Sequence, residues 1–308
     1  MKQSSAHRHE ALAALILGAC AIGFAPIFVR FADVGSTATG FYRMFVAALV
    51  LWPWLLMQER SGTSGSQPPA APRQWLLMIV AGVCFAADVL FFHAASRMTT
   101  VANATLLLNF APIFVVLGAR FMFRETVHPA LVLGLGIALG GATLLMSRSL
   151  SLSVTHLRGD AFGLVAAIFY AGYLLAVSRL RASRSTAQIM VGTSAIGALT
   201  LFPLAILDDE PFLARSLSGW IVLAALGAVS HAGGQGLIAF ALAHLPVGFS
   251  GVALLVQPVA AAVFAWILLE EALGPVQILG GLVVVFGVVL ARRSSDSRAD
   301  QLGMPRSR

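Results

Sequence analysis

Long apolar runs alternate with short polar breaks along the whole chain. A helix needs about 20 predominantly apolar residues to cross the roughly 30 Å hydrocarbon layer of a bilayer. Ten runs of that kind predict ten transmembrane helices and an all-α membrane protein. They cover approximately residues 11–32, 37–57, 74–96, 99–121, 128–147, 159–178, 187–207, 217–238, 246–269 and 274–292.

The composition agrees with a chain that is solvated mostly by lipid. Of its 308 residues, 58% are hydrophobic and only 11% are charged, whereas soluble domains have about 45–50% apolar and about 25% charged residues. The formal charge of +7 raises the question of a nucleic-acid partner. Such a partner requires Lys and Arg gathered on one face, but here they stand at the ends of apolar runs, so we expect no nucleic acid.

The basic residues also predict an orientation, because short cytoplasmic loops are enriched in Lys and Arg. With both termini in the cytoplasm, the inner loops and tails hold most of the basic side chains. We therefore expect a multi-pass protein of a bacterial inner (plasma) membrane. The outer side then retains only Arg30, Arg97, Arg148, Arg158 and Arg215.

One segment of the sequence occurs twice. LLLNFAPIFVVLGARFMFRETVHP (106–129) superposes on a later segment at a shift of 146 positions, which places Pro112 on Pro258 and Glu125 on Glu271. GFAPIFVR (23–30) aligns more weakly with GYLLAVSR (172–179) at a shift of 149. We predict two five-helix repeats, residues 1–150 and 151–308, within one integral membrane domain. Because five is odd, the second repeat enters from the opposite side, an arrangement typical of transporters.

Prolines inside the predicted spans could serve such a mechanism. Pro112 and Pro258 occupy equivalent positions, and Pro26 lies in the first span. A proline inside a helix removes one backbone hydrogen bond and kinks the helix. Each of the three is a candidate hinge, and a static kink is the alternative.

Glycines in the fifth and tenth spans favour close helix packing. Gly136 and Gly140 have the GxxxG spacing of transmembrane helix contacts, and the tenth span contains Gly280, Gly281 and Gly287. We expect these two helices to pack against each other or against a second subunit, which leaves a homodimer open.

Together these features resemble a known family. GFAPIFVRFA in the first span, GFYRMFVAALVLW in the second, and NFAPIFVVLGARFMFRETVHP with its later copy are similar to EamA-type members of the drug/metabolite transporter superfamily, over residues 11–292. The resemblance implies export of small metabolites through a central cavity, with the fifth and tenth helices set aside. Within the family the chain most resembles the YddG-type exporters of aromatic amino acids.

Two charged residues lie inside predicted spans, where a charge costs about 2.5–3.5 kcal/mol on the insertion scale. Asp88 is too short to reach the interface. It is a candidate proton site or substrate-amine site, with a helix-to-helix hydrogen bond as the alternative. Arg43 lies about six residues inside the second span, from which it can extend to the outer headgroups.

Neutral polar and aromatic residues complete the candidate substrate site. His231 and Gln235 stand one helical turn apart and so share a face. Phe24 and Tyr173 correspond at the shift of 149, so we expect them to face each other across the repeat axis and to stack on a ring. Ordinary core packing is the alternative for each. The full candidate set is Phe24, Phe28, Asp88, Asn103, Asn109, Tyr170, Tyr173, His231, Gln235 and Gln257.

Motifs for catalysis are weak. GFSG (248–251) resembles the nucleophile motif of intramembrane serine proteases, but no histidine follows His244 to act as its base. No phosphate-binding loop and no metal-ligand spacing are present, and we expect neither cofactor nor metal.

The sequence favours an alternating-access secondary transporter that exports small metabolites, with aromatic or hydrophobic amino acids preferred. A passive channel and a membrane-embedded enzyme remain as alternatives.

Overall fold

The computed structural model describes residues 2–61, 71–147 and 157–301, and within these ranges every regular element is a helix. Ten helical segments in the described chain are long and apolar enough to cross a membrane. They confirm the ten predicted spans to within a few residues. The predicted boundary between the repeats lies in residues 148–156, outside the described residues.

The first half runs through seven helices that form five spans. The first span is interrupted at Phe24, and the fourth at Asn109 and Phe110. The helices are α1 (Lys2–Gly23), α2 (Ala25–Phe31), α3 (Ser36–Arg60), α4 (Pro72–Met98), α5 (Val101–Leu108), α6 (Ala111–Met122) and α7 (Pro129–Met146).

The second half repeats this plan with a different interruption. Its first span is the continuous α8, whereas its third contains a π-helical segment, η2. The elements are α8 (Leu157–Arg181), α9 (Thr186–Leu207), α10 (Leu217–Ala225), η2 (Leu226–Gln235), α11 (Gly236–Ala241), α12 (Val247–Ala253), α13 (Val256–Leu269) and α14 (Pro275–Gln301).

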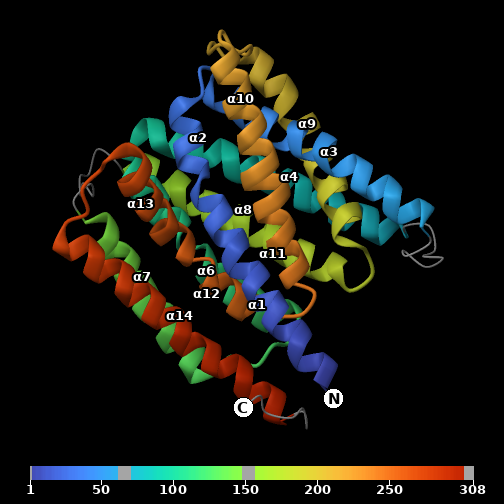
Figure 1. Cartoon of the computed structure of the whole chain (residues 1–308), viewed down its shortest axis with the longest axis vertical. Coiled ribbons are helices and arrows are strands. Elements are labelled where there is room, and N and C mark those ends of the chain that lie inside the picture. Colours follow the sequence, from blue (N-terminus) through green and yellow to red (C-terminus); the bar gives the residue numbers. More distant parts are fainter. Residues whose placement is uncertain (1, 62–70, 148–156, 302–308) are drawn as a thin grey trace.

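Helix contacts obey the two-fold relation between the halves. Equivalent helices pack on each other as α3 with α9 and as α7 with α14. The contact of α4 with α8 has its counterpart in the contact of α1 with η2 and α11. Both ends of the described chain lie at the same end of the bundle (Figure 1), as an even number of spans requires. The structure is therefore an inverted repeat of two five-helix units.

Helices α7 and α14 lie side by side along one edge of the bundle (Figure 1). A Cβ atom on Gly141 would come within 2.7 Å of the Gly280 carbonyl oxygen, and a Cβ on Gly134 within 2.5 Å of the Gly287 carbonyl oxygen. Glycine is therefore required where the two backbones approach. These contacts join the two helices within one chain, which is one of the two arrangements that the sequence left open.

The GxxxG pair itself is not part of that contact. Gly136 and Gly140 are exposed, and a Cβ atom added to either would meet no atom within 4 Å. Gly134 and Gly141, seven residues apart, make the close approach instead. A subunit contact through the face of Gly136 and Gly140 stays a prediction.

The turn after the fourth span is repeated after the ninth in backbone detail. Arg124 and Glu270, equivalent at the shift of 146, have left-handed φ angles of 55° and 56°. The next amide in each copy turns back to an equivalent carbonyl, Glu125 N to Ala119 O at 3.1 Å and Glu271 N to Ala265 O at 3.4 Å. This backbone conformation is unfavourable for a non-glycine residue, so its presence in both copies supports a duplicated unit.

Candidate functional site

The site begins with two interrupted helices. A proline at position i removes the donor that would pair with the carbonyl at i−4, so Pro112 and Pro258 leave the carbonyls of Leu108 and Leu254 without their helical donors. The helix stops there in both copies: α5 ends at Leu108, and Leu254 follows the end of α12. Irregular backbone at membrane depth is tolerated where it is buried in protein or lines a cavity.

A cavity of about 100 Å³ lies at these interruptions. Both halves of the chain line it at equivalent positions, which places it on the pseudo-two-fold axis. The lining pairs related by the shift of 146 are Leu108 with Leu254, Asn109 with Leu255, and Ala111 with Gln257.

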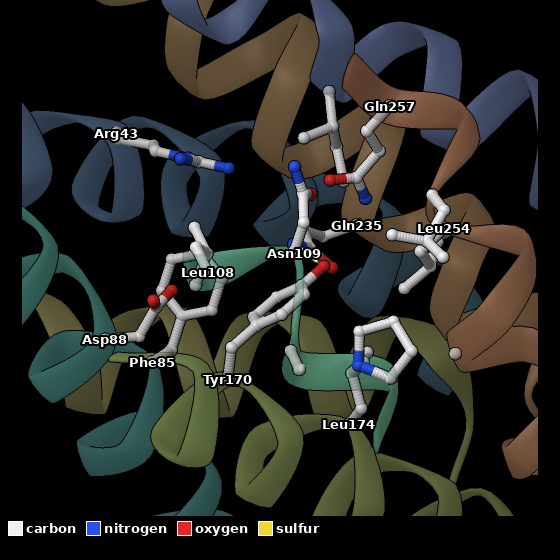
Figure 2. A pocket seen from close by; sticks show the side chains of 15 residues that line it. Arg43, Phe85, Asp88, Leu108, Asn109, Tyr170, Leu174, Gln235, Leu254 and Gln257 are labelled. Atoms are coloured by element: carbon white, nitrogen blue, oxygen red, sulfur yellow. Dashed lines mark hydrogen bonds between the residues drawn. The ribbon is translucent and has the colours of Figure 1, made fainter. Parts of the chain in front are cut away.

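Polar groups from several helices converge on this cavity (Figure 2). Arg43 reaches it from α3 and Asp88 from α4. The Gln235 side-chain amide donates to the Tyr170 hydroxyl at 3.3 Å, which joins η2 to α8. The side-chain oxygen Oε1 of Gln235 is buried and has no hydrogen-bond partner within the described chain. The cavity therefore offers an acidic side chain, a basic side chain and an unused amide acceptor.

Apolar and aromatic side chains form the rest of the lining. Phe85 and Tyr170 approach edge to face, with ring centroids 6.4 Å apart, and Ile22 and Leu174 stand beside them in the lining. Such a mixture of apolar wall and few polar groups is typical of sites for small molecules.

Half of the candidate substrate residues lie at this cavity. These are Asp88, Asn109, Tyr170, Gln235 and Gln257, together with the candidate hinge Pro112. They come from five different spans of both halves, and the sequence alone did not show that they meet.

The aromatic residues of the first span lie elsewhere. Phe24 stacks on Phe264 of α13, with ring centroids 3.8 Å apart, and on Phe28 at 6.0 Å. Neither ring belongs to the cavity lining, and Pro26 is exposed. The break at Phe24 turns these rings toward α13 rather than toward Tyr173. The expected pair of facing rings is therefore not found in this conformation.

Three further candidates are buried in packing contacts. The Tyr173 hydroxyl donates to the Met190 sulfur at 3.8 Å. His231 Nε2 lies 3.1 Å from the Ser194 hydroxyl, and its ring packs edge to face on Phe85. Asn103 lies at the first turn of α5, 3.5 Å from an Asp160 carboxylate oxygen. None of the three lines the cavity, although Tyr173 and His231 support Phe85 from behind. Pro258, the remaining candidate hinge, is also outside the lining.

Arg43 differs from its expected placement. Instead of extending to the headgroups, its guanidinium carbon lies 5.3 Å from the centroid of the Phe85 ring and the side chain lines the cavity. Its Nε atom is buried and meets no acceptor in the described residues. The cation–π contact and Asp88 in the same cavity explain why the interior holds this charge. In the sequence, the presence of a base in the second span and an acid in the third was the signal that could have indicated an inward-facing Arg43.

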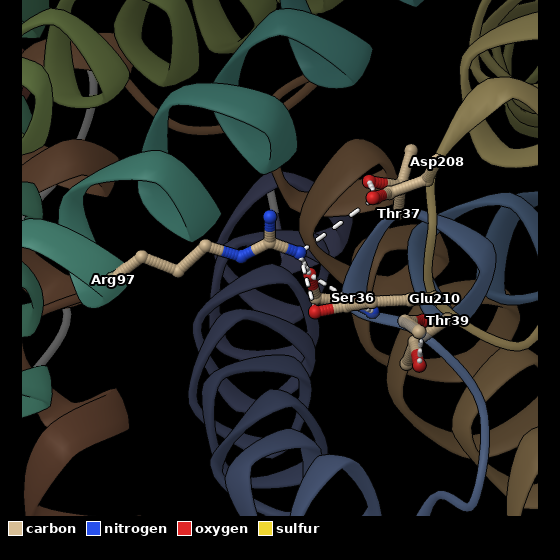
Figure 3. Close-up of polar contacts among 7 residues, drawn as sticks. Ser36, Thr37, Thr39, Arg97, Asp208 and Glu210 are labelled. Atoms are coloured by element: carbon tan, nitrogen blue, oxygen red, sulfur yellow. Dashed lines mark hydrogen bonds and ion pairs between the residues drawn. The ribbon is translucent and has the colours of Figure 1, made fainter.

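A polar cluster ties the helix ends on the side opposite the termini (Figure 3). Arg97 at the end of α4 pairs with Glu210 at 2.6 Å and lies 3.7 Å from Asp208. Glu210 also accepts from the Ser36 amide at 2.7 Å, and Asp208 accepts from the Thr37 hydroxyl at 2.8 Å. The cluster thereby joins the start of α3 to the ends of α4 and α9.

Different contacts tie the side of the termini. Glu125 accepts from the amides of Val247 and Gly248 at 3.2 and 3.4 Å, at the start of α12. Arg184 donates to the Gln74 side chain, with Nη2 at 2.6 Å, and so holds the loop after α8 to α4. Contacts between different spans thus tie helix ends together at both ends of the bundle.

Ten spans in two inverted repeats around a polar cavity define a multi-pass membrane protein, and this arrangement is typical of transporters. The EamA-like transporter family model matches the chain twice, over residues 10–147 and 157–293. The chain therefore belongs to the EamA-like transporter family. A solved crystal structure shares its fold with a TM-score of 0.79 at 18% identity, covering 94% of this chain and 98% of that one.

Several curated relatives are named as transporters. An uncharacterized transporter of Archaeoglobus fulgidus is 25% identical over 281 residues, 91% of this chain and 96% of that protein. The pseudopaline exporter CntI of Pseudomonas aeruginosa PAO1 is 24% identical over 254 residues, 82% and 85% of the two chains. A probable terminal-alkyne amino-acid exporter of Streptantibioticus cattleyicolor is 24% identical over 288 residues, 92% and 93% of the two chains.

Proposed function

We propose that the protein is an alternating-access exporter of amino acids, with aromatic or hydrophobic side chains preferred. The observation that carries this proposal is the cavity on the pseudo-two-fold axis, where two charges face apolar and aromatic walls. An amino acid combines the same features, since it has two charged groups and a side chain that prefers apolar surroundings. The name of one relative, a probable terminal-alkyne amino-acid exporter, supports this class of substrate, and that of another, a pseudopaline exporter, supports export.

The mechanism follows from the two halves. Inverted repeats can exchange conformations, so that one site opens first to one side and then to the other. The interruptions near Pro112 and Pro258 lie beside the cavity in equivalent spans, where a change of angle would move its walls. The Arg97 cluster at one end and the Glu125 contacts at the other are then the two gates.

Counterflow tests this proposal directly. Proteoliposomes preloaded with unlabelled phenylalanine should accumulate external labelled phenylalanine transiently, and leucine more than glycine or uracil should compete. Liposomes without protein give the background. Flux that is not stimulated by substrate on the opposite side would indicate a passive channel instead. Absence of flux for every amino acid, with flux of another metabolite, would remove the substrate assignment and leave a transporter.

The orientation is part of the same proposal. We place the protein in a bacterial inner membrane with both termini in the cytoplasm, on the asymmetry of Lys and Arg. In a variant with Cys20→Ser and Cys84→Ser, a cysteine at Asp209 should react with an impermeant thiol reagent added to whole cells. A cysteine at Ala182, exposed at the opposite end of the bundle, should react only after the cells are opened. The reverse result would invert the orientation.

A further inference from the structure

We infer that Arg43 and Asp88 recognise the two charged ends of a zwitterionic substrate, Arg43 the carboxylate and Asp88 the ammonium. This inference rests on the proposed transport of amino acids and assigns the residues that would select them. Both side chains line the central cavity from neighbouring spans of the first half (Figure 2).

The first argument is that each group has a buried polar atom without a hydrogen-bond partner among the described residues. Asp88 is 6% exposed, and its Oδ1 atom has no hydrogen-bond partner among the described residues. The Nε atom of Arg43 is likewise buried without a partner there. A buried charge that lacks a partner is strongly unfavourable. Side chains kept in that condition at the wall of a cavity are therefore suited to a ligand that brings the missing partners.

The second argument is that the two charges do not neutralise each other by direct contact. No ion pair within 4.0 Å joins Arg43 to Asp88, although ion pairs of that kind form at the helix ends of the described chain, as between Arg97 and Glu210. Arg43 is held over the Phe85 ring instead. An acid and a base that are separated in one cavity fit a zwitterion, whose carboxylate would lie at the base and whose ammonium would lie at the acid.

The chemistry of each group sets the direction of binding. A guanidinium presents a planar fork of donors that matches a carboxylate with two parallel hydrogen bonds. A carboxylate accepts charge-assisted hydrogen bonds from an ammonium group. With both ends held on the side of α3 and α4, the substrate side chain would extend along Tyr170 and Leu174 toward Leu254, just after α12, which explains a preference for apolar side chains.

The test uses substrates that lack one charged group, with purified protein in proteoliposomes. Labelled phenylalanine is the probe. Phenethylamine, which lacks the carboxylate, and 3-phenylpropionate, which lacks the ammonium, are the competitors. Wild-type protein should prefer phenylalanine to both competitors by about 10- to 100-fold, the range expected for one charge-assisted hydrogen-bonded contact.

The variants should lose that preference one end at a time. Arg43→Gln should raise the half-saturation for phenylalanine about 10- to 100-fold and leave competition by phenethylamine unchanged. Asp88→Asn should do the same for phenylalanine and leave competition by 3-phenylpropionate unchanged. Arg43→Lys keeps the charge without the planar fork and should be intermediate. Arg120→Gln and Asp209→Asn, at exposed positions outside the cavity, are the matched controls and should resemble wild type.

The outcomes separate this inference from the proposed function. If wild-type protein exchanges no phenylalanine, the aromatic amino-acid assignment fails, and this inference fails with it. If wild-type protein exchanges phenylalanine while both variants keep its half-saturation, only the inference is overturned. Equal weakening of all three compounds in either variant, with a lowered Tm in detergent, would show that the residue is structural, which also overturns the inference.

Discussion

The first half of the chain supplies both charged side chains of the cavity, whereas the second half supplies only neutral polar groups. At the shift of 149, Arg43 corresponds to Gly192, which packs against Met78. The backbone does not share this asymmetry, because both halves interrupt the equivalent span beside the cavity. The comparison teaches that the duplicated halves share one backbone plan, while divergence of their side chains placed both charged groups of the cavity on one half.

A second asymmetry appears at the repeated turn. Glu125 and Glu271 each follow a residue with a left-handed φ angle, and their amides donate to equivalent carbonyl oxygens. Their side chains then differ: Glu125 binds the start of α12, whereas Glu271 pairs with Arg30. The position equivalent to Val247 is Val101, the start of α5. If the halves exchange conformations as proposed, Glu271 would bind the start of α5 when Glu125 releases α12.

The largest effect on stability is expected where two equivalent helices approach each other most closely, at the contact of α7 with α14. Gly141→Leu and Gly280→Leu would each force a side chain into the backbone of the other helix, because a Cβ atom alone comes within 2.7 Å of it. Overpacking of this kind costs about 3 kcal/mol or more. Thermal unfolding of the purified protein should show a similar, large fall in Tm for both variants.

Gly136→Leu is the matched control on the same helix. Its Cβ atom would meet no neighbour within 4 Å, and leucine is a better helix former than glycine by roughly 0.5–1 kcal/mol. Its Tm should equal or exceed that of wild type. A loss at Gly136 as large as that at Gly141 would contradict the assigned interface and would favour a subunit contact on the open face.

The fold was largely predictable, because it depends on features that are local in the sequence. Ten apolar runs of sufficient length give ten spans, and the match of Pro112 with Pro258 gives the repeat. Helix interruptions at those prolines also follow from local chemistry. The π-helical segment η2 did not, since it depends on how Gly227 and Gly234 pack against α3 and α1.

The site was predictable only in part. Asp88, Asn109 and Gln257 were chosen because polar groups are costly in lipid, and all three line the cavity, although their part in binding stays a prediction. Phe24 and Tyr173 were not placed correctly, because an aromatic ring is equally satisfied by a cavity or by the core. Arg43 was misplaced because reach to the interface depends on which face of α3 points inward, and this is set by tertiary packing.

Substitution of the two equivalent glutamates should have smaller effects than the glycine variants, and the two effects should differ from each other. Glu125→Gln removes a negative charge at a helix N-terminus, an interaction worth about 0.3–1 kcal/mol at the surface. Glu271→Gln removes an exposed ion pair with Arg30, and such pairs contribute about 0–1 kcal/mol. A cysteine at Val247, in a variant without Cys20 and Cys84, should react faster with thiol reagents after Glu125→Gln and at an unchanged rate after Glu271→Gln. Equal rates in the two variants would show that the Glu125 contact does not restrain α12.

The smallest expected effect tests a contact that exists at one end of the molecule only. Asp33, in the turn after α2, accepts from the Ser216 hydroxyl at 2.8 Å and from the amides of Arg215 and Ser216 at 3.1 Å. Its equivalent at the shift of 149 is Ala182, which has no carboxylate. The Ser216 hydrogen bond, with those of the amides, lowers the pKa of Asp33 below its ordinary value.

Because the folded-state pKa of Asp33 is lowered, its contribution to stability is present above the unfolded-state pKa of about 3.9 and is lost as the pH falls through the folded-state value. Asp33→Asn should therefore lower the Tm slightly at pH 7, and this difference from wild type should shrink as the pH is brought below about 4. Asp209→Asn, an exposed carboxylate on the same side, should leave the Tm unchanged at both pH values. A difference for Asp33→Asn that stays constant over this range would show that the side-chain shape, rather than the charge, holds the start of α10. The one-sided contact would then be a packing feature, and the electrostatic asymmetry between the halves would be confined to Arg43, Asp88 and the repeated turn.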